Sequence, residues 1–332
     1  MPESAAGAGA PRRRRRASPG LLRGGMALVG LLVAVAAAAP LLAPHDPAEQ
    51  VDPATAQNLP PGSSLAEIHL VDGRRLLAER VARTAAGLTA LRRGRLETFR
   101  AAEVANLTAG GVAHRRRFVL GSDRFGRDVL SRTLYGARVS LAVAILAVAL
   151  ALSLGIAVGA AAALGGRLLD GVLMRLVDAL LAFPSFFLVI AISALFHAGG
   201  ATVVLVLAAT SWMETSRLAR AELLSLERRD FVLAARATGE GPLAIFWRHL
   251  LPNAMTPLLV QGALLVGLLI LAESSLSFLG LGIQPPTPSW GNMISDGSSA
   301  LVRTWWVATF PGAALAVTVI AFNLLADGLR DA

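Results

Sequence analysis

The sequence contains no cysteine and no lysine among its 332 residues. Without cysteine, the chain cannot form a disulfide, a thiolate metal site or a cysteine nucleophile. Without lysine, it cannot supply the essential lysine of a GxxxxGK[ST] phosphate-binding loop. If ATP acts on this protein, a different chain must therefore bind it.

Charged residues are also scarce, at 16% of the chain, whereas 55% of the residues are hydrophobic and the mean hydropathy is +0.60. This balance excludes an ordinary soluble domain and predicts a membrane protein with several spans. The net charge of +9 comes from arginine, and in so apolar a chain arginine clusters indicate topology rather than nucleic-acid binding. The five histidines share no helical ligand spacing, and GxSxG and HExxH are absent, so we predict no metal, no bound cofactor and no catalytic residue.

The apolar stretches predict an all-α integral membrane protein with six transmembrane helices, since about 20 residues cross a bilayer. One N-terminal helix (21–43) precedes a five-helix core within residues 139–332. The expected spans cover residues 21–42, 141–164, 172–196 with a kink at Pro184, 201–213, 255–283 and 305–325.

The N-terminal residues 1–20 are predicted to be disordered and cytoplasmic, because they are small, polar and carry the run Arg12–Arg16. The same basic run ahead of an alanine-rich apolar stretch also fits a cleaved signal peptide, and this alternative stays open. With a cytoplasmic N-terminus, alternation of six spans also places the C-terminus and the loop 214–256 in the cytoplasm. The arginines of that loop agree with the positive-inside rule.

The long polar section, residues 44–138, predicts an extracytoplasmic insertion followed by a surface helix. Turn residues Asp72-Gly73 and Arg93-Gly94 separate strand-like runs, so two β-hairpins are expected within residues 52–117. The following stretch GSDRFGRDVLSR (121–132) has charges at i,i+3 and i,i+4 spacing, which favours a salt-bridged helix at the outer membrane surface.

The segment 231–253, FVLAARATGEGPLAIFWRHLLPN, is polar and basic although apolar stretches flank it. Gly239 predicts the end of one short helix, Gly241-Pro242 the start of a second, and Pro252-Asn253 the end of that second helix. Two short helices joined by a glycine elbow would form a compact docking knob. An ordinary cytoplasmic loop with an amphipathic helix is the competing interpretation.

This segment resembles the EAA–x3–G–x9–I–x–LP signature of ABC-transporter permeases that work with a binding protein. Matching positions hold Ala234, Ala235, Gly239, Leu251 and Pro252, whereas Leu233 replaces the glutamate and His249 the isoleucine. The variant AARA-x-G…RH-x-LPN is similar to the dipeptide, oligopeptide and nickel branch, in its C-type subunit. Three further strings resemble the same branch: LGSDRFGRDVLSRTLYGARVSL, ESSLSFLGLGIQPPTPSWGNMISDG and FPGAALAVTVIAFNLLADGLRDA.

The resemblance implies a permease that forms half of an uptake pathway in the bacterial cytoplasmic (inner) membrane, with peptides or similar small solutes as cargo. It implies four partners besides the bilayer: a second homologous permease, two ATP-binding subunits and an extracytoplasmic substrate-binding protein. ATP would be bound by the partner subunits, so the chain itself would not be an enzyme. A secondary transporter and a non-transporting membrane subunit are the alternatives, although the internal repeats expected of the former are not visible.

Site residues follow from this interpretation. The segment 231–253 would couple to the ATPase subunits through Ala234, Ala235, Arg236, Gly239, Arg248, His249, Leu251 and Pro252. Polar groups inside spans are costly and thus functional candidates, which suggests Glu273, Ser274, Ser275 and Ser277 as pathway residues. A buried carboxylate that a neighbouring helix satisfies is the equally weighted alternative for Glu273.

Overall fold

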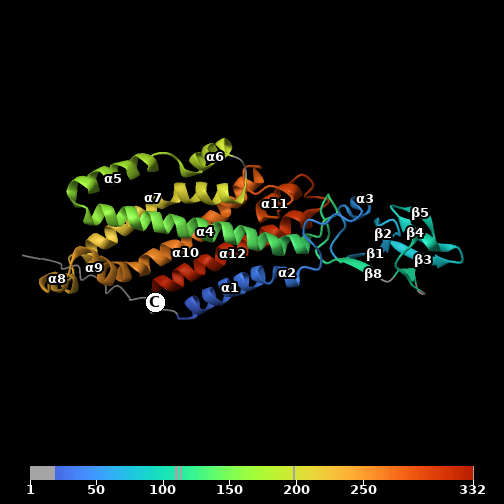
Figure 1. Ribbon diagram of the computed structural model, residues 1–332, viewed down its shortest axis with the longest axis horizontal. Helices are drawn as coiled ribbons and strands as arrows, with labels where there is room; N and C mark the ends of the chain where they lie inside the picture. Colours follow the sequence, from blue (N-terminus) through green and yellow to red (C-terminus); the bar gives the residue numbers. More distant parts are fainter. Residues whose placement is uncertain (1–18, 109–110, 113, 197–198, 332) are drawn as a thin grey trace, which may run out of the picture.

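The computed structural model describes residues 19–108, 111–112, 114–196 and 199–331, so most of the expected N-terminal segment 1–20 lies outside the described residues. The chain is elongated, with helices along most of the long axis and strands gathered at one end (Figure 1). The bundle contains α1 (Pro19–Ala37), α4 (Val129–Leu164), α7 (Gly200–Leu226), α10 (Leu251–Phe278) and α12 (Trp305–Asp331). The predicted helical membrane fold with a strand-containing insertion is therefore confirmed.

Four helical stretches of the described chain are long and apolar enough to cross a membrane. They are Gly20–Ala37, Val129–Leu164, Pro242–Phe278 and Trp305–Asp331. The pair α5 (Gly166–Leu181) and α6 (Ser185–Leu195) would add a fifth, but the two helices meet at 84° around the predicted break at Pro184. Length and composition thus give four or five spans rather than six, because polar residues in the second half of α7 lower its hydropathy.

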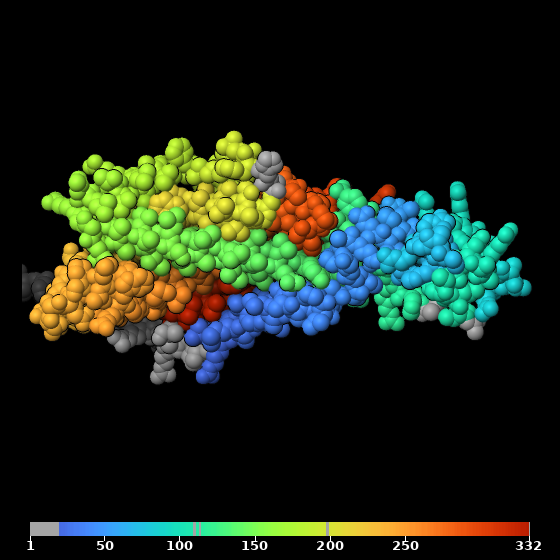
Figure 2. Space-filling view, in the orientation of Figure 1, coloured from blue at the N-terminus to red at the C-terminus, as the bar shows by residue number. Residues whose placement is uncertain are grey.

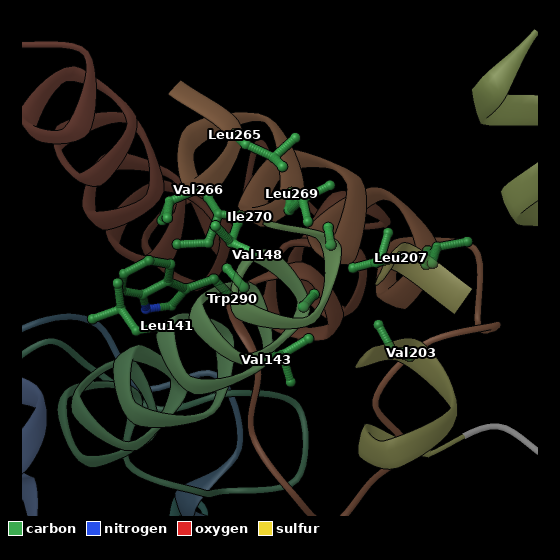
Figure 3. Close-up of a cluster of buried hydrophobic side chains, with 14 of the residues drawn as sticks. Leu141, Val143, Val148, Val203, Leu207, Leu265, Val266, Leu269, Ile270 and Trp290 are labelled. Carbon is green, nitrogen blue, oxygen red and sulfur yellow. The ribbon is translucent and has the colours of Figure 1, made fainter. Parts of the chain in front are cut away.

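The largest core cluster lies where α4, α7 and α10 meet (Figure 3). The cluster includes Leu141 and Val148 of α4, Leu207 of α7 and Ile270 of α10, and the indole of Trp290 lies beside Leu141 at one side of it. Trp290 opens the short helix α11 (Trp290–Ser298) and donates from Nε1 to the carbonyl of Thr133 at 3.1 Å. The core is therefore formed by segments that are distant in sequence.

Two pairs of helices approach closely because glycines remove side chains from the contact. On α4, a Cβ added at Gly155 would lie 2.6 Å from Cβ of Thr215, and one at Gly159 would lie 2.6 Å from the carbonyl oxygen of Ser216 on α7. On α1, a Cβ at Gly25 would lie 2.6 Å from the Leu325 nitrogen of α12. Figure 2 shows α1 lying along the outside of the bundle, where this contact holds it. Small residues allow such close packing inside membranes.

The insertion contains two three-stranded antiparallel sheets and a short two-stranded one, β6 (Leu107–Thr108) with β7 (Gly111–Val112), around two small cores. One three-stranded sheet has the order β2 (Arg75–Ala78), β1 (Ser63–His69), β8 (His114–Phe118), and the other β3 (Arg80–Thr84), β4 (Gly87–Arg92), β5 (Arg95–Arg100). Both predicted hairpins are present, β1–β2 around Gly73 and β4–β5 around Arg93-Gly94, and these turn residues have positive φ as short hairpin turns require. Strand β3 pairs with β4 in the second sheet, which the two predicted hairpins did not indicate.

The predicted surface helix at residues 121–132 is wrong for its first part. Residues 121–128 form an irregular turn, because Gly121 and Gly126 have φ of +81° and +75°, which a helix does not accommodate. Only from Val129 is the segment helical, as the first turn of α4, and Asp128 caps it by accepting from the Ser131 amide at 2.8 Å. The expected i,i+4 pair Asp123–Arg127 does exist, but it is buried in this turn.

Candidate functional site

The segment 231–253, called the knob from here on, lies at the end of the long axis opposite the strands (Figure 1). It follows α7 directly and contains α8 (Asp230–Ala237), α9 (Pro242–Ile245) and a π-helical turn at Phe246–Leu250 that continues into α10. The knob is therefore joined at both ends to long helices of the bundle, without a flexible linker.

The predicted glycine elbow is confirmed. Gly239 has a φ of +85° and follows the last turn of α8, where its amide donates to the Arg236 carbonyl at 3.0 Å and the Glu240 amide to the Ala235 carbonyl at 3.1 Å. This is the hydrogen-bond pattern of a Schellman motif, which needs a left-handed residue and thus favours glycine. The next helix starts at Pro242, as expected.

The predicted helix end at Pro252-Asn253 is wrong. Pro252 lies in the first turn of α10, and the helical path from Phe246 runs through it to Phe278. Proline is tolerated there because its missing N–H is not needed in a first turn, and the preceding π-helical turn takes up the change in path. A movement of the knob would therefore reach α10 directly.

A small core holds the knob to the ends of α7 and α10. Val232 and Ala235 of α8 pack with Phe246 and Leu250 of the π-helical turn, and Ala219, Leu223, Ile245, Ala254 and Leu258 complete the cluster. Ala235 is thus buried inside the chain, whereas Ala234 is exposed. Of the two predicted small contact residues, only Ala234 is exposed at the surface of the knob, where Pro252 is also exposed and Leu251 is half-buried.

The basic residues of the knob have different surroundings. Arg236 pairs with Glu227 at the end of α7, and Nε2 of His249 lies 3.0 Å from Oε2 of Glu240, across the elbow. Arg248 is exposed and forms no ion pair with any residue that the structure describes. His249, at a position where the general signature differs, therefore connects the two halves of the knob instead of facing outward.

Sequence reasoning missed an apolar surface on the knob. The side chains of Phe231, Leu233, Leu243 and Trp247 are 41%, 50%, 75% and 63% exposed, respectively. In the sequence, Leu233 stands out only because it replaces the glutamate of the signature, and no motif marks Phe231, Leu243 or Trp247. Large apolar residues within a polar, basic segment were the available signal, but their exposure depends on how the knob folds. Large apolar side chains exposed on a polar surface are typical of sites that bind another protein, a membrane or a ligand.

All four candidate pathway residues lie in α10, and three of them, Glu273, Ser274 and Ser277, are on the side that faces the rest of the chain. Glu273 is fully buried and accepts hydrogen bonds from Ser140 Oγ of α4 at 2.9 Å and Ser277 Oγ at 2.7 Å, with Ser274 Oγ at 3.4 Å. Ser140 Oγ also accepts from the Trp290 amide at 3.3 Å. The carboxylate thereby connects α10, α4 and α11, and the structure brings together three of the four predicted pathway residues.

Ser275 points elsewhere. With Ser274, it lines a separate open cavity of about 390 Å³ on the surface of α10, among the side chains of Phe186, Leu271 and Phe278. Its hydroxyl donates to the Leu271 carbonyl at 2.8 Å, which is the usual way for a serine to be satisfied inside an apolar helix. No group of three or more His, Cys, Asp or Glu residues within the described ranges could hold a metal ion.

Two family models match the chain. "Binding-protein-dependent transport system inner membrane component" matches residues 151–332, and "N-terminal TM domain of oligopeptide transport permease C" matches residues 21–61. The di/tripeptide transport system permease protein DppC of Pseudomonas aeruginosa is 40% identical over 67% of this chain and 73% of its own length. The dipeptide transport system permease protein DppC of Escherichia coli K12 is 45% identical over the same shares.

Among solved structures, an inward-facing form of the MetNI methionine ABC transporter is similar in fold. The match has a TM-score of 0.50 and 17% identity, and it covers 60% of this chain and 96% of that chain. The first family model covers more than half of the sequence, and it includes the knob and the buried Glu273. The chain therefore belongs to the binding-protein-dependent transport system inner membrane components and is a transmembrane permease subunit of an ABC transporter.

Proposed function

We propose that this chain is half of the translocation pathway of an ATP-driven importer for peptides, and that the knob couples it to the ATPase subunits. The proposal rests on one observation above all: the exposed patch Phe231, Leu233, Leu243 and Trp247 on a knob fused to α7 and α10. The names of the relatives, which are dipeptide and di/tripeptide permeases, support peptides as the cargo.

The complete transporter would contain a second homologous permease, two ATP-binding subunits and an extracytoplasmic substrate-binding protein. ATP would be bound and hydrolysed by the separate subunits, because this chain has no lysine for a phosphate-binding loop. Apolar contacts would supply most of the docking energy, since exposed ion pairs contribute only about 0–1 kcal/mol each. Exposed Arg248 and Ala234 would lie at the rim of this contact, while Arg236 and His249 keep the shape of the knob through Glu227 and Glu240.

The proposed topology has six spans in the bacterial inner membrane, with α5–α6 as a bent third span and α7 as the fourth. The start of α1 and the end of α12 lie toward the end of the bundle that carries the knob (Figure 1). Placing that end in the cytoplasm puts the short arginine-rich loop inside, as the positive-inside rule requires, and the long insertion outside. The close contact of Gly25 with α12 supports a retained first helix.

Trp247→Ser is expected to weaken binding of the ATPase subunits to the permease by at least about tenfold, because large aromatic side chains at the centre of an interface dominate its affinity. The measurement is the dissociation constant of the detergent-solubilised permease for the purified ATPase subunits. Leu96→Ser is the matched control, since Leu96 is 74% exposed at the opposite end of the molecule. Equal affinities of the Trp247 variant and the wild type would rule out the patch as the docking surface.

For the pathway, we propose that Ser275 contacts the cargo and that Glu273 holds the helices together. Glu273→Gln is expected to keep uptake near the wild-type rate, because the amide oxygen still accepts from one of Ser140 and Ser277 while the amide NH2 can donate to the hydroxyl oxygen of the other. Glu273→Leu is expected to lower stability by about 1–3 kcal/mol, because the buried serine hydroxyls lose their acceptor. Uptake by reconstituted transporter and thermal unfolding of both variants provide the test. Loss of uptake in Glu273→Gln at unchanged stability would instead assign the carboxylate to the pathway.

A further inference from the structure

The insertion is folded, and both of its three-stranded sheets (residues 63–118) lie outside the two family models, which match residues 21–61 and 151–332. Its two sheets enclose a core of Ile68, Leu70, Ala78, Leu88, Ala90 and Val104. A second core, which includes Leu65, Leu77 and Phe118, fixes the first sheet to the segment around Val51 and Ala56. The chain has therefore retained a structured module that the shared permease fold does not require.

Ion pairs keep the module's first core in place. Asp52 lies between the two sheets and accepts from the Leu77 amide at 3.0 Å and from Arg92 NH2 at 2.7 Å. Burial raises the pKa of Asp52, but these hydrogen bonds outweigh it and hold the pKa below its ordinary value. Glu49 pairs with Arg116 and Arg75 in the same way. These carboxylates are charged at neutral pH, so the module keeps its shape there.

The module is also fixed to the helices. In the turn at residues 121–128, the Asp123 carbonyl accepts a hydrogen bond from the Asn58 amide at 3.0 Å. Ser122 Oγ accepts another from the Leu59 amide at 2.8 Å. On its other side, Arg127 NH2 lies 3.1 Å from Oδ2 of Asp296 in α11, and Trp306 Nε1 of α12 donates to the Ser122 carbonyl at 3.0 Å. A force on the module is thus transmitted to α11 and α12 through buried contacts.

One face of the module is mostly open to solvent in the described chain, although Gly87 on it is buried and Thr89 and Leu91 are half-buried. Alternation along β3, β4 and β5 turns Leu88, Ala90 and Val81 inward and presents the opposite face to solvent. We call this the arginine face, and its residues are Arg80, Ala82, Thr84, Gly87, Thr89, Leu91, Leu96, Thr98 and Arg100.

The arginine face has no acidic residue among its own members, although the Glu103 carboxylate beside it accepts a hydrogen bond from the Arg100 amide at 2.9 Å. Arg80 and Arg100 are exposed, as are Arg93 and Arg95 at the adjacent β4–β5 turn. None of these four arginines forms an ion pair with a residue that the structure describes. By contrast, Arg92 on the inward side is paired with Asp52 and Glu97. Exposed Leu96 adds apolar area among the charges. The combination of arginine and apolar contact favours a protein partner with an acidic surface.

The position of this face excludes the bilayer as its partner. The β3–β4–β5 sheet lies at the far end of the long axis, beyond the β1–β2–β8 sheet and away from the helices that cross the membrane (Figure 1). Lipid headgroups surround the helix ends, so the first sheet separates them from the arginine face. Only a molecule that approaches from the extracytoplasmic solution would meet it.

We infer that the arginine face docks an acidic surface of the extracytoplasmic substrate-binding protein. Through the turn at residues 121–128, this docking would be coupled mechanically to α11 and α12. The inference rests on the proposed function, which supplies such a partner on this side of the membrane. Charge complementarity would mainly raise the association rate and set the orientation of the delivered protein.

The test uses the complete transporter in lipid nanodiscs and the purified binding protein as the probe. Arg80→Glu combined with Arg100→Glu is expected to weaken docking by about tenfold, mainly through a slower association rate, and to reduce its dependence on salt. The matched control is Arg115→Glu combined with Arg117→Glu, which reverses two exposed charges on β8 in the other sheet. Circular dichroism and thermal unfolding establish that both variants are folded.

Several outcomes would overturn the inference: unchanged docking in the Arg80/Arg100 variant, equal weakening in the Arg115/Arg117 control, or weaker binding to anionic vesicles at unchanged protein docking. Measurements on the wild-type transporter distinguish a failure of this inference from a failure of the proposed function. A wild-type complex that hydrolyses ATP and takes up peptide, yet docks its partner regardless of the arginine face, contradicts only the inference. A wild-type complex without ATP-driven uptake contradicts the proposed function itself.

Discussion

Gly239→Val is expected to lower ATP-driven uptake at least about tenfold while the protein still inserts and folds. Gly239 has a φ of +85°, and a Cβ added there would meet no atom within 4 Å. The substitution therefore creates no clash. Its effect is backbone strain of about 1–3 kcal/mol for a β-branched residue in the left-handed region. Relief of that strain would open the Schellman motif and turn α8 away from α9, which displaces Phe231 and Leu233 relative to Leu243 and Trp247.

Gly241→Val is the control for this prediction. Gly241 lies two residues away in the same loop, also has free space around its Cβ position, and has a φ of −70° before Pro242. Valine adopts that conformation readily, and the residue before a proline favours it. Uptake by reconstituted transporter, with ATP hydrolysis measured in parallel, compares the two variants. Full coupling in Gly239→Val, or equal losses in both variants, would show that the elbow geometry does not matter.

Gly159→Leu is expected to prevent stable folding of the bundle. A Cβ at this position would lie 2.6 Å from the Ser216 carbonyl oxygen, 2.8 Å from Cβ of Ala219 and 2.9 Å from the Arg220 nitrogen. Two of these atoms belong to the backbone of α7, so no side-chain rotation relieves the clash and the helices must separate. Overpacking of a well-filled core lowers the free energy of unfolding by about 1–3 kcal/mol, and occasionally by more. For a leucine at position 159 we expect a loss at or above the upper end of this range.

Gly312→Leu controls for the loss of a helical glycine. Gly312 lies within α12, and a Cβ there would meet no atom within 4 Å. Thermal unfolding monitored by size-exclusion chromatography in detergent is expected to show a large fall in midpoint, or aggregation, for Gly159→Leu and little change for Gly312→Leu. Similar midpoints for the two variants would contradict a close α4–α7 contact through Gly159.

The knob illustrates how far local sequence reaches. Gly239 and Pro242 act through their own backbone preferences, so the elbow and the second helix start could be predicted from them. Pro252 could not be interpreted in this way, because a proline after a helix and a proline in a first turn look alike until the path of the next helix is known. The exposure of Trp247 and the burial of Ala235 depend on the packing of α8 against the π-helical turn.

Glu273 and the 121–128 turn show the same limit at longer range. The main partner of Glu273 outside its own helix is Ser140, 133 residues earlier in the chain, and Arg127 meets Asp296 across 169 residues. Spacing within a segment predicted the Asp123–Arg127 pair, but it could not show that the pair is buried or that a distant carboxylate completes it.

The sequence by itself determined the membrane class, the two hairpins, the glycine elbow and the family resemblance, because hydropathy, turn chemistry and local motifs act over a few neighbouring residues. Only the tertiary structure decided which surfaces are free. It buried Glu273 among serines and fused the knob with α10. It exposed Phe231, Leu233, Leu243 and Trp247, and turned the arginine face of the insertion outward. The physical reason is that burial and charge pairing depend on contacts between segments far apart in the chain, which no local pattern records.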